Sequence, residues 1–283
     1  MIISGTQLAK ELKQDVARRV VEAKEKYGRA PHLVVILVGE APASQSYVKG
    51  KGKDAEEVGF KGTTIRRPAD ITEEELLAMI AELNADDTVD GVLVQLPLPK
   101  HIDEDKVIEA IAKEKDVDGF HPANVASLWQ KLPCTLPCTP KGIIKMLDKA
   151  GVEIEGKKAG VIGRSNIVGL PVSKLLLDRN ATVTMAHSRT KNLAEVTSAA
   201  DILVVAIGRP RFVTADMVGE GAAVIDVGVN RDPETGKLCG DVDYEACKDK
   251  ASVITPVPGG VGPMTRACLM ENTLECFLRK MEK

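Results

Sequence analysis

Tyr47 and Lys51 combine a flat ring with an amine, side chains that could hold a planar molecule and move its protons. They are four residues apart in the stretch SYVKGKGKDAEEVGF, residues 46–60, which we expect to form a helix. Residues at i and i+4 share one helix face, so the ring and the amine should point the same way. Gly50 and Gly52 lie in the same stretch, although glycine inside a helix costs about 1 kcal/mol relative to Ala. Stability alone therefore does not account for this segment.

Two further polar residues are expected close to this helix. Gln95 ends the apolar run in LVQLPLP, and Asp118 lies in the glycine-containing turn of KDVDGFHP. The carboxyl ends of parallel strands are the edge at which open α/β sheets bind ligands. We therefore expect an aromatic ring, an amine, an amide and a carboxylate to converge at one edge of a sheet.

Each of these residues also has a structural alternative. Tyr47 could be a half-buried core ring, and Lys51 could be one more exposed charge on a helix. Asp118 could be an ordinary turn acid, a role that Asp116 could fill instead. The sequence pattern alone leaves these alternatives open.

A glycine loop in the second half of the chain indicates a phosphate-binding turn. The apolar run KKAGVIG is followed by GRSNIVGLP, residues 163–171, and then by an expected helix. Such a turn lets backbone N–H groups and a helix N-terminus face a phosphate. Because Arg164, Ser165 and Asn166 occupy the middle of the loop, the motif is not G-x-G-x-x-G. A plain strand-to-helix turn is the alternative.

The next expected strand favours a phosphorylated dinucleotide. TVTMA, residues 182–186, is followed by His187, Ser188 and Arg189. NAD-binding folds place an acid for the ribose about 20 residues beyond the glycine loop. Here a hydroxyl and a guanidinium stand instead, and with Arg164 they could hold a 2′-phosphate. We predict NADP rather than NAD, the alternative being surface arginines without a ligand.

Apolar, β-branched runs alternate with amphipathic runs along the chain. The expected helices cover 4–26, 46–60, 72–84, 103–114, 141–150, the residues after Pro171, 191–199 and 265–283. The expected strands cover 32–39, 62–66, 89–97, 157–163, 182–186, 201–208 and 222–230. This alternation predicts parallel sheets with helices on both faces. The pattern restarts after PCTPKG, so we predict an α/β protein with two α/β domains around a cleft, the second a Rossmann-type parallel sheet.

Composition excludes several classes of protein. The chain has 283 residues, 44% hydrophobic and 28% charged, which is the balance of a soluble globular protein. A net charge of −3 and 3% aromatic residues give no reason to expect nucleic acid or a membrane surface as partner. There is no signal-peptide pattern and no apolar run of membrane-span length. The six cysteines form no C-x-x-C pair, so we expect no metal site, no disulfide and a cytoplasmic location.

Six motifs, in this order, carry a resemblance to a known family: YVKGK, DGVLVQLPLP, KDVDGFHPANV, PCTPKG, GRSNIVG and TPVPGGVGPMT. They resemble the bifunctional methylenetetrahydrofolate dehydrogenase/cyclohydrolase family over nearly the whole chain. The resemblance implies a folate-binding catalytic domain (1–139 with 265–283), an NADP-binding Rossmann domain (140–264), and a last helix that returns to the first domain. Folds of this kind often dimerise through the nucleotide domain, so we expect a homodimer.

The resemblance also implies an activity and residue roles. The activity is oxidation of 5,10-methylenetetrahydrofolate by NADP⁺, followed by hydrolysis of the methenyl product to 10-formyltetrahydrofolate. The resemblance implies that Lys51, Gln95 and Asp118 are the catalytic residues, with Lys51 as the catalytic lysine and Gln95 as its partner. It also implies that Tyr47 would stack on the folate and that Asp118 would bind the pterin amino group. The other implied substrate-binding positions are Leu96, Pro258, Gly259 and Gly260. The implied cofactor-binding positions are Gly163, Arg164, Ser165, Ile167, Ser188, Arg189, Ile207, Gly208 and Val229.

The chain departs from the family pattern at a few positions. Ala126 and Ser127 stand where the family usually has Gly-Arg, and Arg266 stands where an apolar residue is common. We expect Arg266 to lie in solvent, with changed contacts to the acidic tail of the folate as the alternative.

Three rival functions remain at this point. The first is another NADP oxidoreductase, of the amino-acid or shikimate type, which would have no reason to combine Tyr47 and Lys51 with Gln95 and Asp118. The others are a dinucleotide-binding sensor and a relative that keeps only the dehydrogenase. An intact Lys51 and Gln95 pair argues against both.

Overall fold

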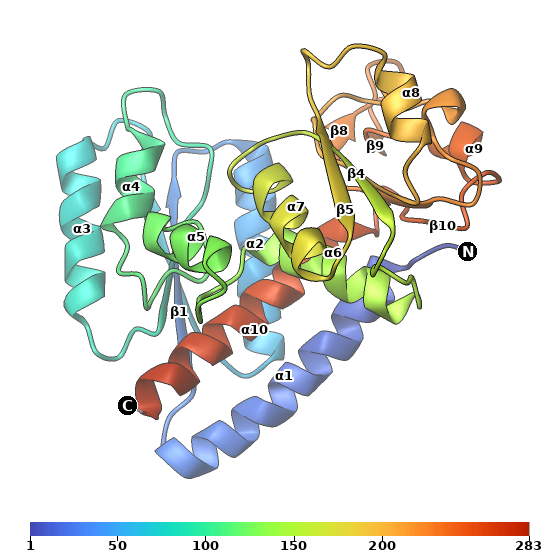
Figure 1. Cartoon of the computed structure of the whole chain (residues 1–283). Helices are drawn as coiled ribbons and strands as arrows, with labels where there is room; N and C mark the ends of the chain where they lie inside the picture. Colours follow the sequence, from blue (N-terminus) through green and yellow to red (C-terminus); the bar gives the residue numbers. More distant parts are fainter. Residues whose placement is uncertain (283) are drawn as a thin grey trace. The chain divides into compact units, whose positions relative to one another are not determined.

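The computed structural model describes residues 1–282 and divides into two compact units. The first unit contains residues 10–138 and the chain from residue 266 onward, and the second contains residues 1–9 and 139–265. Two long helices, α1 (Gly5–Tyr27) and α10 (Val261–Met281), begin in the second unit and continue in the first (Figure 1). Among the described residues, no helix is long and apolar enough to cross a membrane.

The first unit is built on a three-stranded parallel sheet of order β2-β1-β3. Its elements are β1 (His32–Val38), α2 (Pro42–Glu57), β2 (Lys61–Arg67), α3 (Glu73–Ala85), β3 (Gly91–Val94), α4 (Glu104–Ala110) and α5 (Pro122–Trp129). Every residue of β1 is buried, as expected for the central strand of a sheet covered on both faces.

Helices cover both faces of this sheet because side chains alternate along the strands. Val34, Ile36 and Val38 pack with the apolar residues of α3 and α4. Leu33 faces the other way, toward Thr273 of α10, and Figure 1 shows α2 on the side of β1 opposite α3. The pattern places α2 and its polar residues along one face of the sheet.

The second unit is a five-stranded parallel sheet of order β10-β7-β6-β4-β5. Its elements are α6 (Cys138–Lys149), β4 (Lys158–Ile162), α7 (Gly169–Asp178), β5 (Thr182–Ala186), α8 (Leu193–Ser198), β6 (Ile202–Val205), the 3₁₀ turn η1 (Ala215–Met217), β7 (Ala223–Asp226), β8 (Asn230–Arg231), β9 (Leu238–Cys239), α9 (Tyr244–Cys247) and β10 (Val253–Ile254). Helices α7 and α8 lie on opposite sides of β4 and β5 (Figure 1). The prediction of parallel α/β sheets is confirmed.

Differences from the expected elements lie mostly at their ends. The expected strand 89–97 spans only Gly91–Val94, and the cis peptide before Pro97 follows it. The last helix begins at Val261 rather than at residue 265, because Pro263 falls in its first turn, where its missing N–H is not needed. Helix α5 lies outside the predicted elements, although the ring of His121 caps it and Pro122 begins it, a usual helix-start signal.

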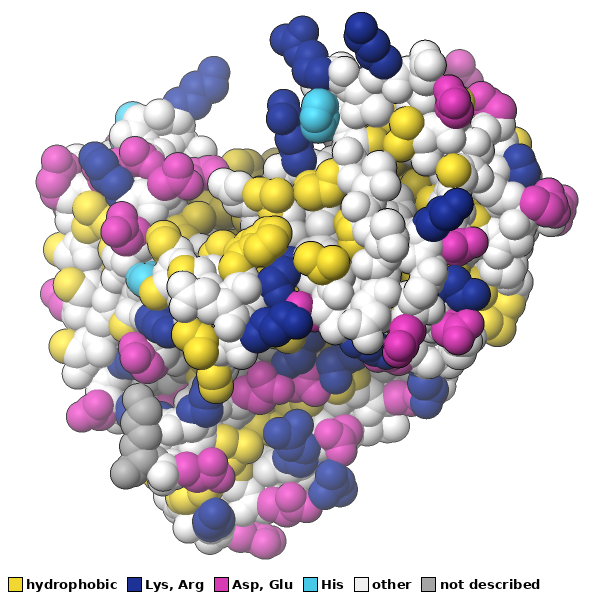
Figure 2. All heavy atoms as spheres, in the orientation of Figure 1, with side chains coloured by type: hydrophobic (Ala, Val, Ile, Leu, Met, Phe, Trp, Pro, Cys, Tyr) yellow, Lys and Arg dark blue, Asp and Glu magenta, His cyan; other side chains and the backbone are white. Residues whose placement is uncertain are grey.

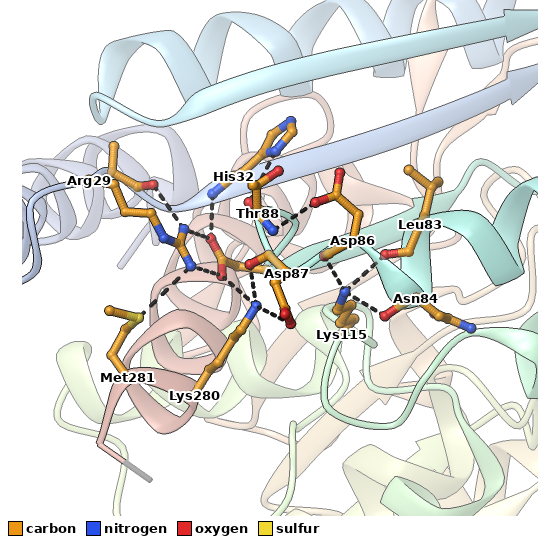
Figure 3. A network of polar contacts seen from close by, with 12 residues as sticks. Arg29, His32, Leu83, Asn84, Asp86, Asp87, Thr88, Lys115, Lys280 and Met281 are labelled. Carbon is orange, nitrogen blue, oxygen red and sulfur yellow. Dashed lines mark hydrogen bonds and ion pairs between the residues drawn. The ribbon is translucent and has the colours of Figure 1, made fainter.

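A network of polar contacts ties together the parts of the first unit that are distant in sequence (Figure 3). The buried carboxylate of Asp90 accepts two hydrogen bonds from Arg29, at 2.6 and 2.8 Å, and one from the backbone N–H of His32 at 2.9 Å. Nearby, the amine of Lys115 donates to three backbone carbonyls at the end of α3, at 2.7 to 2.9 Å. Burial lowers the pKa of Lys115 below its usual value, but its ammonium is satisfied by these carbonyls.

We expect Asp90→Asn to lower the free energy of unfolding by roughly 3 kcal/mol, because the partly buried guanidinium of Arg29 loses its countercharge. Asp87→Asn is the matched control. Asp87 also faces Lys280, but its side chain is 99% exposed, so the change should stay below about 0.5 kcal/mol. Urea unfolding of both variants measures the difference, and equal losses would contradict a special role for Asp90.

Candidate active site

Lys51 and Gln95 form a hydrogen-bonded pair at the carboxyl edge of the first sheet. The amine of Lys51 donates to Oε1 of Gln95 at 2.9 Å, and Nε2 of Gln95 donates to the carbonyl of Leu96 at 2.7 Å. The two bonds agree on one orientation of the amide. Lys51 is only 9% exposed, whereas Tyr47, on the same face of α2, is 40% exposed. Tyr47 is therefore not a core ring, and Lys51 is not a solvated surface charge.

Asp116, rather than Asp118, is the structural acid of the following turn. Its carboxylate accepts from the backbone N–H groups of Gly119 at 3.0 Å and His121 at 2.9 Å, and from the side-chain amide of Asn124 at 2.8 Å. Asp116 is paired with Val92 of β3 in a parallel bridge, so Asp118 lies beside the carboxyl end of that strand. The turn is thus held by Asp116, and the carboxyl of Asp118 is not needed to hold it and can bind a ligand.

The charge of Asp118 is influenced by its surroundings. Burial raises the pKa of the Asp118 carboxyl above its usual value, and the charge of Asp116 adds to this effect. The charge of Lys51 and a contact with the thiol of Cys138 lower the same pKa. Lys51 is therefore close enough to act on Asp118 electrostatically, and Asp118 and Leu96 line one small cavity beside β3.

Asn272 of α10 holds the backbone on both sides of this turn. Its side-chain amide donates to the carbonyl of Val117 at 2.9 Å and to the carbonyl of Leu136 at 2.8 Å. The thiol of Cys138 donates to the same Val117 carbonyl at 3.3 Å. Asn272 is fully buried, and sequence reasoning missed it because a lone Asn within a long helix carries no local signal.

The departures from the family pattern have clear structural surroundings. Ala126 is exposed on α5, and the hydroxyl of Ser127 donates to the carbonyl of Ala123 at 2.7 Å. Nε of Arg266 lies 3.2 Å from Oδ2 of Asp54, so the expectation that Arg266 lies free in solvent is wrong.

Two glycines of the second unit close the loop between β4 and α7 tightly. Gly163 has a φ of 121°, and an added Cβ would lie 2.3 Å from the carbonyl oxygen of Ala206. A Cβ on Gly169 would lie 2.4 Å from the carbonyl oxygen of Gly163. Because β5 and β6 flank β4 on opposite sides, this loop stands at the point where the strand order reverses, the usual ligand-binding position of such sheets.

The predicted phosphate-binding residues lie on the loops that follow β4 and β5. Arg164, Ser165, Ser188 and Arg189 are all exposed. Oγ of Ser165 accepts from the backbone N–H groups of residues 168 and 169, at 3.2 and 3.3 Å, which leaves its own hydroxyl hydrogen for a ligand. Figure 2 shows Lys and Arg side chains, with a His, gathered around the loop between β5 and α8. The exposed cations and the glycine turn fit a phosphorylated dinucleotide.

A buried carboxylate orders the loop after β6. Asp241 accepts from three consecutive backbone N–H groups, those of Ile207 at 2.7 Å, Gly208 at 3.0 Å and Arg209 at 2.8 Å. It also accepts from the side-chain amide of Asn230 at 2.8 Å. Two predicted cofactor positions, Ile207 and Gly208, therefore owe their conformation to a residue that the sequence interpretation did not single out. Its only sequence signal is the glycine before it.

A second buried carboxyl supports the first. Asp226, the last residue of β7, accepts from the backbone N–H groups of Gly228, Asp241 and Val242 at 2.9 to 3.0 Å. Burial raises the pKa of Asp226 to about 6, and the charge of Asp241 adds to the effect. The predicted position Val229 lies three residues further along the chain and is exposed, as is Ile167.

The remaining predicted substrate positions lie in the loop that leads into α10. The carbonyl of Gly259 accepts from the backbone N–H of Thr6 at 3.0 Å, and Gly260 is packed directly against Gly5. Pro258 follows a cis peptide bond and is exposed. All three belong to the second unit, together with every predicted cofactor position, whereas Tyr47, Lys51, Gln95, Leu96 and Asp118 belong to the first.

The raised pKa of Asp226 predicts a pH dependence of stability. The folded pKa, about 6, exceeds the unfolded value of 3.8, so the stabilising contribution of the neutral carboxyl is complete below pH ~4 and is lost as the pH rises through 6. The loss should be roughly 3 kcal/mol at most. Urea unfolding between pH 4.5 and 7, with wild type compared with Asp226→Asn, isolates this contribution. A difference that does not change with pH would contradict it.

Comparison with known proteins identifies the family. The tetrahydrofolate dehydrogenase/cyclohydrolase catalytic-domain model matches residues 3–118, and the NAD(P)-binding-domain model of the same family matches residues 137–281. The "Bifunctional protein FolD" of Streptococcus pneumoniae serotype 4 is 58% identical over 282 residues, which cover 100% of this chain and 99% of the relative.

Solved structures agree with this result. The crystal structure of the bifunctional enzyme FolD, methylenetetrahydrofolate dehydrogenase/cyclohydrolase, from Campylobacter jejuni has a TM-score of 0.96 and 48% identity, covering 99% of both chains. The methylenetetrahydrofolate dehydrogenase-cyclohydrolase of Trypanosoma brucei, complexed with NADP cofactor and an inhibitor, has a TM-score of 0.96 and 39% identity, covering 100% of this chain and 99% of the other. The chain therefore belongs to the tetrahydrofolate dehydrogenase/cyclohydrolase family.

Proposed function

We propose that this chain oxidises 5,10-methylenetetrahydrofolate to the methenyl compound with NADP⁺ and then hydrolyses that product to 10-formyltetrahydrofolate. The observation that carries this proposal is the partly buried 2.9 Å hydrogen bond between Lys51 and Gln95, beside Asp118. An amine held in this way can handle protons next to a bound ring. A dinucleotide-binding sensor or a relative limited to dehydrogenation would not need the pair.

The first unit would bind the folate. The exposed ring of Tyr47 offers a stacking surface for the flat pterin, and the carboxyl of Asp118 accepts hydrogen bonds from its amino group. Leu96 provides an apolar contact next to Gln95. Asp118 can serve the ligand because Asp116 already holds the turn.

Lys51 would carry the proton transfers of the hydrolytic step. Water adds to the methenyl carbon, the five-membered ring opens, and the formyl group remains on one nitrogen, so protons must leave the water and reach the departing nitrogen. The amide of Gln95, fixed by its bond to the Leu96 carbonyl, accepts from the amine and orients it. The oxidative step needs little acid–base help, so positioning dominates there.

The second unit would hold NADP, which supplies the hydride acceptor when bound. The Gly163 and Gly169 turn brings backbone close to a pyrophosphate, and Arg164, Ser188 and Arg189 would bind the 2′-phosphate. Ser165 would donate its hydroxyl hydrogen to a phosphate. The remaining cofactor contacts would come from Ile167, Ile207, Gly208 and Val229, and Pro258, Gly259 and Gly260 would close over the substrate.

A homodimer in the cytoplasm is the remaining part of this proposal. Leu177 and Leu238 are exposed apolar side chains on the second unit and offer contact area for a second copy. Light scattering on the purified protein should give twice the chain mass of 30.3 kDa. A single-chain mass at micromolar concentration would contradict the dimer.

The activity is tested with methylenetetrahydrofolate and NADP⁺, and again with NAD⁺. NADPH and the methenyl product should appear together, and the methenyl product should then disappear faster than in buffer. Lys51→Met should lower methenyl hydrolysis at least about 100-fold, because the proton-transfer group is lost, and should also reduce dehydrogenation. Lys53→Met, an exposed lysine of α2, is the control and should behave as wild type. Unchanged hydrolysis in Lys51→Met would falsify the role of Lys51.

A further inference from the structure

The guanidinium of Arg266 lies directly on Gly50 of α2. A Cβ built on Gly50 would lie 2.0 Å from Nη1 of Arg266 and 3.2 Å from its Cζ. An alanine at this position would therefore force the guanidinium away. Gly52 differs, since an added Cβ there would meet nothing within 4 Å. Of the two glycines in this helix, Gly50 has a steric reason and Gly52 shows none.

Asp54 holds the guanidinium in this place. Its Oδ2 lies 3.2 Å from Nε of Arg266, and its Oδ1 accepts from the amine of Lys13 at 2.8 Å. The carboxylate is buried, so the ion pair is shielded from solvent on the side of Asp54. Because Lys13 is also paired with Glu57, two cations face two carboxylates here, and Asp54 is shared between Lys13 and Arg266.

The other end of the guanidinium extends toward Tyr47 and Lys51. Nε is anchored at Asp54, whereas Nη1 lies at Gly50, one helical turn nearer the start of α2. Residues 47, 50, 51 and 54 share a helix face. Within residues 1–282, no hydrogen bond or ion pair engages Nη1 or Nη2, and the side chain is 34% exposed. A cation with unused donors therefore stands beside the proposed folate site.

We propose that Arg266 binds a carboxylate of the glutamate tail of the tetrahydrofolate substrate. Gly50 leaves the space that the guanidinium occupies, and the ion pair with Asp54 holds it there. This inference rests on the proposed function. A guanidinium binds a carboxylate through two parallel hydrogen bonds, and Nη1 and Nη2 carry four of its five N–H groups. Tetrahydrofolates join a flat pterin to a glutamate that is ionised at neutral pH. With the pterin on Tyr47 and Asp118, Arg266 receives the anionic end.

The test compares two substrates that differ only in the tail, methylenetetrahydrofolate and the carboxamide of methylenetetrahydropteroate, which lacks the glutamate and carries no carboxylate. Arg266→Val should raise the KM for the glutamate-bearing substrate about tenfold, since a charge-assisted pair is lost, with little change in kcat. The KM for the tail-less substrate should stay the same. Lys49→Ala removes one exposed positive charge from the same helix and is the control, expected to leave both KM values unchanged.

Gly50→Ala provides an independent route to the same result. The new methyl group displaces the guanidinium, so the KM should rise for the glutamate-bearing substrate alone, although alanine favours the helix and the melting temperature should not fall. The double variant with Arg266→Val should show little further increase, because both changes remove one interaction.

The possible outcomes separate this inference from the proposed function. Equal KM changes for both substrates, or none in either variant, would overturn the role of Arg266 while wild-type turnover upholds the proposed function. A lower melting temperature of Arg266→Val with unchanged KM would reduce Arg266 to a structural residue. Wild type that turns over neither substrate would overturn both proposals.

Discussion

Hydrogen bonds from backbone N–H groups to buried aspartates hold, in each of the two units, the loops that carry predicted site residues. Asp116 folds the turn that presents Asp118, and Asp241 gathers the loops after β6 and β7. Loops that leave a sheet lose their ladder partners, and an unpaired buried N–H is costly. A carboxylate can accept several such groups at once through short, charge-assisted bonds. The loops are therefore ordered before any ligand arrives.

Holding loops with buried carboxylates is unfavourable where two carboxylates lie close together. Asp226 and Asp241 lie together under the same loops, and Asp226 accepts from the backbone N–H of Asp241. Burial and the neighbouring charge raise the pKa of Asp226 to about 6, even though three N–H groups favour its ionised form. The two carboxylates repel each other because both must lie close to the loop N–H groups that they accept.

Helix α2 shows a similar compromise between stability and function. Its buried face presents Lys51 to Gln95, and its exposed turn presents Tyr47. Gly50 weakens the helix locally but admits the guanidinium of Arg266, which Asp54 holds in place. A helix designed only for stability would carry alanine at this position. Gly50, which looks unfavourable in the sequence, therefore serves a contact from outside the helix, whereas Gly52 has no such contact.

The sequence by itself determined the α/β class, the alternation of strands and helices, and the family, because these depend on local periodicity and on motifs that are contiguous in the chain. It also indicated which residues belong to the site. It favoured Asp118 for the site with Asp116 as the alternative, and the tertiary structure supplied the physical distinction, through the N–H groups that bond to Asp116. Asp241, Asn272 and the pairing of Arg266 with Asp54 depend on partners distant in the chain. No local pattern encodes such partners, since their positions are set only when the strands and helices pack.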